Sequence, residues 1–352
     1  MNFSRKLAEH PSAQNPKAQD RIRIALARIP NVLEKQTVAH HKTLEQKISD
    51  QGPNHLRVDP QLLGLAIQEL HEHRRTITHH PHPPTRTKSW YANAGADADA
   101  VQKKLAELAP LYASVSTGNF PNLVGDALEV IVYKALLSLN QAHPRYAFHG
   151  VFDVNASKDR HGRYSKTEPP QIVSGHRTHK VPDFILYGFD SGPICIECKN
   201  LREWFYPGER RIKDLIKMAL DLHVTPLFVA RRIHYTTIRN FLEPAGIIAH
   251  ETYYQYYPTA HQALADRVKH KRSLGFSDIR ATEDPHPRTI KFFQHDLMKV
   301  AEKMAERFRN NETALSDYVG NEINLAQLYD AIGSPVESKW VNYEDPDPHE
   351  FS

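Results

Sequence analysis

Two short apolar runs lie near the middle of the chain, and each of them contains acidic side chains. The runs are Val181–Phe189 and Pro193–Asn200, and valine, isoleucine and phenylalanine dominate both. Glycine or proline lies at or near the ends of each run, which is typical of β-strands. The three residues between them, Asp190-Ser191-Gly192, are suited to a turn. The pattern therefore predicts a β-hairpin.

Side chains on a strand alternate between its two faces, which decides where the polar residues of this hairpin lie. Glu197 and Lys199 are two residues apart and therefore share one face. The hairpin brings Asp183 alongside them. The expected result is a convergence of two carboxylates and one ammonium group.

The surrounding hydrophobic pattern predicts an α/β core. A nearly all-apolar helix runs from Gly125 to Leu139 and contains Glu129, and a second helix covers about Glu209–Leu222. Further strands are predicted at Tyr146–Val154 and Pro226–Arg232. The order is helix, three strands, helix, strand.

Adjacent carboxylates repel each other unless a cation lies between them, and Mg²⁺ or Mn²⁺ prefers carboxylate, carbonyl and water oxygens as ligands. Asp183 and Glu197 therefore predict a metal site. A bound metal lowers the pKa of a water ligand and withdraws charge from a phosphoryl oxygen, while Lys199 can orient the attacking water or hold the phosphate. This is the chemistry of phosphodiester hydrolysis.

Pro182-Asp183 and Glu197-Cys198-Lys199 resemble the signature of the PD-(D/E)xK nuclease superfamily. The resemblance implies the restriction-endonuclease-like fold, a mixed central sheet flanked by helices. The resemblance covers roughly residues 122–258. It implies that Asp183, Glu197 and the main-chain carbonyl of Cys198 bind the metal and that Lys199 is catalytic. It also implies a metal-site role for the helical Glu129. The structural alternatives are a surface hairpin with a solvated Glu–Lys pair, and a helix-cap or salt-bridge role for Glu129.

The first ninety or so residues have a different pattern. Helices are predicted at Asp20–Ile29, Val32–Ile48 and Pro60–Arg74, and a β-hairpin follows, with strands around Ile77 and Thr87–Tyr91. This order resembles a winged helix-turn-helix domain, in which Pro60–Arg74 would be the recognition helix and the hairpin the wing. The implied DNA contacts are Gln61, Gln68, His71 and Arg74 on the helix, with Arg86 and Lys88 on the wing. Winged domains also bind proteins, which is the alternative.

Four segments are therefore expected. They are a winged-helix-like domain at 1–94, a linker helix at 95–121 that stops near Pro110, a nuclease core at 122–260 and a C-terminal helical extension with an acidic tail at 261–352. In the last two segments an apolar strand from Gly246 ends in tyrosines at Tyr253–Tyr257, which can pack in the core or stack on bases. An amphipathic helix at Pro287–Asn310 is expected to pack on the core, with homodimer formation as the alternative.

Composition adds a mild preference for nucleic acid. The net charge is +4 and the basic residues cluster after the Glu197-Cys198-Lys199 strand. Arg210, Lys213 and Lys217 recur at helical spacing on one face and are expected to contact DNA phosphates. The two cysteines, Cys195 and Cys198, lie on opposite faces of a strand, which favours buried thiols over a zinc site. There is no long apolar segment and no signal-peptide pattern, so a cytoplasmic protein without membrane contact is expected.

Together these features predict a metal-dependent DNA endonuclease, a phosphodiester hydrolase of a restriction or antiviral (phage-defence) system. No nucleotide-binding motif is present, so any ATP-driven partner would be a separate chain. Two alternatives remain open. One is a structure-selective repair or recombination nuclease, and the other is a non-enzymatic DNA-binding regulator with a degenerate nuclease fold.

Overall fold

The structure is a computed structural model of the chain, and it describes residues 3–10, 15–82, 85–159 and 162–335, without the side chains of 82–89. The chain divides into two compact units. One, here the N-terminal unit, consists of Met1–Pro121 and His261–Ile279. The other, here the sheet unit, consists of Asn122–Ala260 and Arg280–Lys339. The border at Pro121/Asn122 coincides with the start of the predicted core, whereas residues 261–279 group with the N-terminal unit.

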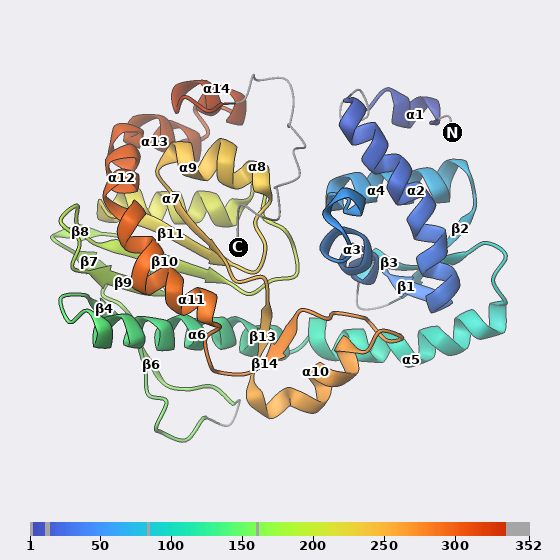
Figure 1. Cartoon of the computed structure of the whole chain (residues 1–352), viewed down its shortest axis with the longest axis horizontal. Coiled ribbons are helices and arrows are strands. Elements are labelled where there is room, and N and C mark those ends of the chain that lie inside the picture. The colour runs from blue at the N-terminus through green and yellow to red at the C-terminus, as the bar shows by residue number, and fades with distance from the viewer. Residues whose placement is uncertain (1–2, 11–14, 83–84, 160–161, 336–352) are drawn as a thin grey trace. The chain divides into compact units, whose positions relative to one another are not determined.

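A five-stranded mixed sheet forms the centre of the sheet unit, in the order β12-β11-β10-β9-β4 (Figure 1). Strands β10, β11 and β12 are parallel to one another, and β9 runs antiparallel to both of its neighbours, β10 and β4. The bounds are β4 Ala147–His149, β9 Phe184–Tyr187, β10 Ile194–Lys199, β11 Thr225–Ala230 and β12 Ile248–Glu251. The fold is therefore mixed α/β with a mixed sheet, as predicted.

Helices cover both faces of this sheet because its central strands are apolar on both sides. One face packs against α6 (Phe120–Ala142) and α12 (Leu297–Asn310), and its core includes Cys198. The other face packs against α7 (Arg210–Leu222), α13 (Glu312–Gly320) and α14 (Leu325–Ala331), and its core includes Cys195. The two cysteines are free buried thiols on opposite faces, as the alternation predicted.

The predicted helix Pro287–Asn310 is a continuous helical stretch of α11 (Pro287–Lys291), a π-helical turn η7 (Phe292–Asp296) and α12. Its apolar side chains lie in the cores of the sheet unit, including Phe293, Leu297, Met304 and Phe308. Packing on the core, the first of the two alternatives, is therefore confirmed. Val300 is the exception, at 38% exposure.

Two predicted strands are each divided by a residue with positive φ. Tyr146–Val154 forms β4 and β5 (Val151–Phe152), separated by Gly150 at φ +99, and β5 pairs with β6 (Lys166–Thr167) instead of the main sheet. The tyrosine-ending strand forms β12 and β13 (Gln255–Tyr257), separated by Tyr253 at φ 60. Apolar alternation does not show such interruptions, because it records burial and not backbone direction.

The N-terminal unit contains a three-stranded sheet of order β1-β3-β2 packed with helices. The bounds are α2 Pro16–Gln36, β1 Val38–His40, α3 His41–Glu45, α4 Pro60–Gln68, β2 Ile77–His82, β3 Thr85–Asn93 and α5 Ala98–Ser116. A π-helical turn, η2 (Gln46–Asp50), follows α3, and another, η4 (Glu69–His73), extends α4. The predicted helix Pro60–Arg74 and the hairpin after it are both present, and Asp59 caps the helix by accepting from Gln61 N at 2.7 Å.

Two helix boundaries predicted at prolines were wrong. The helices expected at Asp20–Ile29 and Val32–Ile48 are one helix, α2, which continues through Pro30, followed by strand β1 and α3. The linker helix likewise passes Pro110 and ends at Ser116. An internal proline costs about 3 kcal/mol. In both helices buried apolar residues occur on each side of the proline, such as Ile29 and Leu33 in α2, and their burial offsets that cost.

The remaining elements are short: α1 Arg5–Ala8, η3 Asn54–Leu56, β7 Ile172–Val173, β8 His176–Arg177, α8 Tyr235–Thr237, η5 Ile238–Leu242, α9 Glu243–Ala245, η6 Thr259–His261, α10 Gln262–Lys269 and β14 Ile279–Ala281. In the described part of the chain, no helix has both the length and the apolar character that crossing a membrane requires.

Candidate active site

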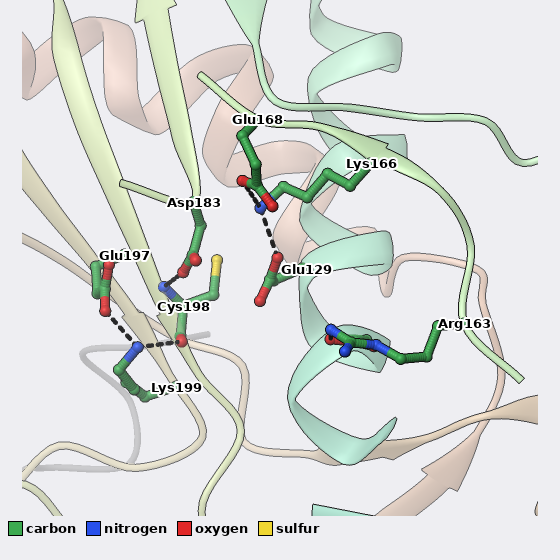
Figure 2. Close-up of polar contacts among 9 residues, drawn as sticks. Glu129, Arg163, Lys166, Glu168, Asp183, Glu197, Cys198 and Lys199 are labelled. Atoms are coloured by element: carbon green, nitrogen blue, oxygen red, sulfur yellow. Dashed lines mark hydrogen bonds and ion pairs between the residues drawn. The ribbon is translucent and has the colours of Figure 1, made fainter. Parts of the chain in front are cut away.

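Asp183, Glu197 and Lys199 lie at one edge of the main sheet (Figure 2). Strand β10 ends at Lys199, and β9 begins directly after Asp183. The antiparallel pairing of Ile196 with Phe184, together with the hydrogen bond from Asp183 N to Ile196 O at 3.0 Å, places Asp183 beside the end of β10. The edge also carries the carboxyl ends of the parallel strands β11 and β12, where open α/β sheets usually bind ligands.

The Asp183 carboxylate is held against the backbone of β10. Its Oδ2 accepts a hydrogen bond from Cys198 N at 2.6 Å. Burial, and after it the charge of Glu197, raise the pKa of Asp183. Gly150 packs directly on this residue, since a Cβ at position 150 would lie 2.5 Å from the Asp183 carbonyl oxygen. The glycine allows β4 to approach the site closely.

Lys199 turns back toward the strand that carries it. Its Nζ donates to Glu197 Oε1 and, at 3.1 Å, to the carbonyl oxygen of Cys198. Burial disfavours its charged form, but the carboxylates of Glu197 and Asp183 raise the pKa of Lys199 overall. The lysine is therefore a cation at neutral pH, suited to holding an anion and not to removing a proton.

Glu129 lies on α6 and contacts a lysine that the sequence analysis did not identify. Lys166, on β6, donates to Glu129 Oε2 at 2.8 Å and also lies 3.1 Å from Glu168 Oε2 (Figure 2). Burial, and then the Asp183 charge, raise the pKa of Glu129, and Lys166 opposes this rise. Asp183 thus has Glu197 and Lys199 on one side and the Glu129–Lys166 pair on the other.

A polar cavity of about 280 Å³ opens next to this pair. Beside it, Arg163 pairs with Asp126 through two nitrogen–oxygen contacts, one of them 2.9 Å. Both Asp183 and Glu129 reach the cavity, while Glu197 and Lys199 do not line it. The lining residues are Asp126, Glu129, Phe152, Arg163, Tyr164, Lys166, Glu168, Val181 and Asp183.

Asn200, directly after the lysine, joins the elements that carry the site. It is 3% exposed, and its Nδ2 donates to Val124 O on α6 at 2.5 Å and to Tyr256 O on β13 at 2.7 Å. Its Oδ1 accepts from Tyr256 N at 3.1 Å. One buried side chain therefore fixes the end of β10 relative to the helix that carries Glu129.

The donor atoms suit a hard cation. Two carboxylates and a main-chain carbonyl are oxygen ligands of the kind Mg²⁺ and Mn²⁺ take. Burial, and after it the charge of Glu197, raise the pKa of Asp183, and a bound cation would favour its charged form. Within the described residues, however, no three His, Cys, Asp or Glu side chains already converge at metal-binding positions. Glu129 is engaged by Lys166 and Glu197 by Lys199.

The side chains of α4 and η4, and of Arg74 directly after them, that were predicted to contact DNA are only partly available. Gln61 is exposed in the first turn of α4. Gln68 donates to both carboxylate oxygens of Glu72 at 2.9 Å, and His71 Nδ1 lies 3.4 Å from Ile77 O. Arg74 donates to the buried Glu69 at 3.1 Å. The side chains of Arg86 and Lys88 lie outside the described residues.

The three residues of α7 that were predicted to contact DNA do not act alike. Arg210 and Lys217 are exposed. Lys213 instead donates to Asn321 Oδ1 at 2.9 Å and lies 4.3 Å from the centre of the Tyr318 ring. Lys213 therefore connects α7 to α13, which leaves Arg210 and Lys217 open for phosphate contact.

Lys166, Arg163, Tyr164, Asp126 and Glu168 were missed from the sequence. A signal was present, because residues 158–180 contain six lysines and arginines and only one apolar pair, Ile172-Val173. It has no fixed spacing, and so it could not be assigned to a strand or to a site. Comparisons with protein-family models, with curated proteins and with solved structures give no match to this chain.

Proposed function

We propose that this chain is a metal-dependent DNA endonuclease that hydrolyses phosphodiester bonds, with a restriction or phage-defence role. The observation that carries the proposal is the grouping of Asp183, Glu197 and Lys199 at one sheet edge. Asp183 accepts from Cys198 N at 2.6 Å, and Lys199 lies on Glu197 and on the Cys198 carbonyl. These are the residues that the resemblance to PD-(D/E)xK nucleases assigns to catalysis.

Asp183, Glu197 and the Cys198 carbonyl oxygen would hold Mg²⁺ or Mn²⁺. When bound, the metal supplies a water of lowered pKa and withdraws charge from a phosphoryl oxygen. Lys199, kept cationic by its carboxylate neighbours, would hold a non-bridging oxygen of the scissile phosphate as negative charge develops there. Glu129 and Lys166 lie on the cavity side of Asp183, where they would position the substrate or its water.

Two features support DNA as the substrate. The N-terminal unit has helices α2, α3 and α4 followed by the β2–β3 hairpin, an order similar to that of winged helix-turn-helix domains. Gln61 on α4, and Arg210 and Lys217 on α7, present exposed polar or cationic groups. Backbone contacts of this kind give affinity, while base contacts from a helix give sequence preference.

The test is incubation of the purified chain with plasmid, linear and branched DNA in the presence of Mg²⁺ or Mn²⁺. Discrete fragments support a restriction-type nuclease, and cuts that depend on branches support a structure-selective repair enzyme. Binding without cleavage by wild-type protein, at metal concentrations that raise its melting temperature, would refute the proposal in favour of a DNA-binding regulator. Asp183→Ala is the control that separates this activity from a contaminating nuclease.

A further inference from the structure

Two tyrosines that follow β12 lie against arginine side chains. The guanidinium carbon of Arg288 is 4.4 Å from the ring centre of Tyr253, and that of Arg232 is 4.5 Å from the same ring. Arg280 is 3.8 Å from the ring centre of Tyr254. An arginine that stacks on an aromatic face keeps its N–H groups directed outward in the guanidinium plane, where they can bind a phosphate.

The two outer arginines carry uncompensated charge. Arg280 and Arg288 are exposed, and among the described residues neither lies within ion-pair distance of a carboxylate. The surroundings respond to this charge. The pKa of His286, which lies 5.2 Å from the Tyr254 ring, is lowered by burial and then by Arg280 and Arg288. The group of Tyr253, Tyr254, Arg280 and Arg288, here the Arg–Tyr surface, is therefore electropositive.

The backbone of this surface is under constraint. Tyr253 has φ 60, a left-handed conformation that a bulky residue rarely adopts. Its N–H donates to Arg231 O at 3.1 Å, and the preceding Thr252 N donates to Ala230 O at 2.9 Å. These bonds hold the turn that places both tyrosine rings beside the arginines.

The Arg–Tyr surface lies at the same sheet edge as the candidate active site. Lys199, Ala230 and Glu251 are register partners across β10, β11 and β12, and Tyr253 follows Glu251 by two residues. Two strand spacings separate β12 from β10, or roughly 10 Å. This corresponds to about three base-pair steps along a DNA duplex. On the other side, Gln255 Nε2 donates to Asn200 O at 3.2 Å, which ties the segment to the end of β10.

We propose that the Arg–Tyr surface binds the phosphodiester backbone of the DNA substrate a few nucleotides from the scissile phosphate. The ligand is thus a polyanionic strand, with Arg280 and Arg288 each contacting a phosphate. This inference rests on the proposed nuclease function for the identity of its ligand. It concerns binding and not the chemical step, so the two can fail separately.

The experiment measures binding of a short labelled DNA duplex to the full chain by fluorescence anisotropy, over a series of salt concentrations, with Ca²⁺ in place of Mg²⁺. The variants are the double substitution Arg280→Gln/Arg288→Gln and the charge-preserving Arg280→Lys/Arg288→Lys. Arg309→Gln is the matched control, because this exposed arginine donates to Ser191 O at 3.2 Å in the turn at the opposite end of β10. Thermal melting checks that each variant is folded.

The glutamine double variant should bind at least about tenfold more weakly. The slope of log K against log salt should fall by about two units, since each lost phosphate contact removes roughly 0.9. The lysine double variant should keep the slope while losing part of the affinity, because the charge remains and the stacked bidentate contact does not. Arg309→Gln should match the wild type in both quantities.

If the glutamine double variant has unchanged affinity and slope while Lys199→Ala is inactive in cleavage, the Arg–Tyr surface does not bind the DNA backbone. The nuclease function then still stands. If the wild type binds DNA but never cuts it, and the slope still falls by about two units in the glutamine double variant, the nuclease function is refuted and the assignment of the Arg–Tyr surface stands. If inorganic phosphate competes as strongly as unlabelled DNA at equal phosphate concentration, the surface is a site for free phosphate. This result would overturn the proposal that it binds a DNA strand.

Discussion

Lys166 Nζ and Glu129 Oε2 lie 2.8 Å apart, so the glutamate expected at the metal site is already paired with a cation of the chain itself. The two side chains are 11% and 18% exposed, and Lys166 also lies 5.2 Å from the centre of the Phe184 ring. Phe184 directly follows Asp183 along the chain. The pair therefore couples α6 and β6 to the residue most central to the site.

Lys166→Met should destabilise the fold by up to about 3 kcal/mol, because it leaves the buried Glu129 carboxylate near Asp183 without its cation. Glu129→Gln should cost less, because Lys166 keeps Glu168 at 3.1 Å. The double variant should lose less unfolding free energy than the two single variants lose together. The coupling free energy, measured by urea unfolding, should exceed about 1 kcal/mol. The exposed pair Lys104–Glu107 is the control and should couple by less than about 0.5 kcal/mol. Additive losses at Glu129 and Lys166 would contradict the ion pair.

Asp183→Asn should reduce cleavage by about 10²-fold or more without reducing stability in metal-free buffer. The raised pKa of Asp183 means that its charged form is disfavoured in the folded chain, and asparagine keeps an acceptor for Cys198 N without that charge. Mg²⁺ should raise the melting temperature of the wild type and not of the variant. Lys199→Ala should be equally inactive, with DNA affinity within several-fold of wild type. Near wild-type cutting by either variant would reject the assignment of these residues.

Asn200→Ala should cost on the order of 3 kcal/mol, because it leaves two carbonyls and one N–H without partners in a buried position. Asn200→Asp should be worse at neutral pH, since it places an anion beside the Val124 and Tyr256 carbonyls. Chemical unfolding of the three proteins gives the order directly. Equal stability of all three would mean that the contacts at Asn200 do not hold the site together.

Stability should depend on His250 in acid. Burial, and then the charge of Arg288, lower the pKa of His250 to about 3 from an ordinary value of 6.5. Below about pH 6.5 the unfolded chain binds a proton that the folded chain does not. The free energy of unfolding therefore decreases by up to about 1.4 kcal/mol for each unit by which the pH is lowered. His250→Gln should remove this slope relative to wild type between about pH 6 and 4. Substitution of the exposed His295 is the control.

Arg74→Ala should lower the stability of the N-terminal unit by about 1 to 3 kcal/mol, because Arg74 donates to Glu69, which is 3% exposed. A purely DNA-reading arginine would leave stability unchanged. The neighbouring Arg75 is exposed and serves as the matched control. Stability is read by thermal melting and base preference by binding to a panel of single-base variants.

The sequence was sufficient to predict the β9–β10 hairpin and the side-chain faces of β10. Two short apolar runs separated by turn residues indicate the strands and the turn directly. It was also sufficient to predict that Asp183, Glu197 and Lys199 lie at one edge of the sheet, because a short turn between two consecutive strands determines which of their residues are neighbours. Lys166 and Asn200 could not be foreseen in the same way. Their partners, Glu129, Val124 and Tyr256, lie far away in sequence, and no periodicity encodes a contact between separate elements.

The proline-based boundaries failed for a related reason. A proline has a local cost that can be read from the sequence, whereas the burial that offsets it at Pro30 and Pro110 depends on the tertiary structure. The division of the tyrosine-ending strand at Tyr253 was missed for the same reason, because a tyrosine gives no indication of a positive φ. Local preference was reliable where no distant contact opposed it.

Cys195 and Cys198 place one thiol in each of the two helix-covered layers, three residues apart on a single strand. A thiol reagent in solution can reach either sulfur only when the helices on that side detach. In variants that keep only one of the two cysteines, the rate of thiol labelling would therefore report how often one side of β10 is exposed. Comparing the two rates compares the opening of the α6 side with that of the α7 side. An unequal pair of rates would identify which layer is released first while the other still shields the strand.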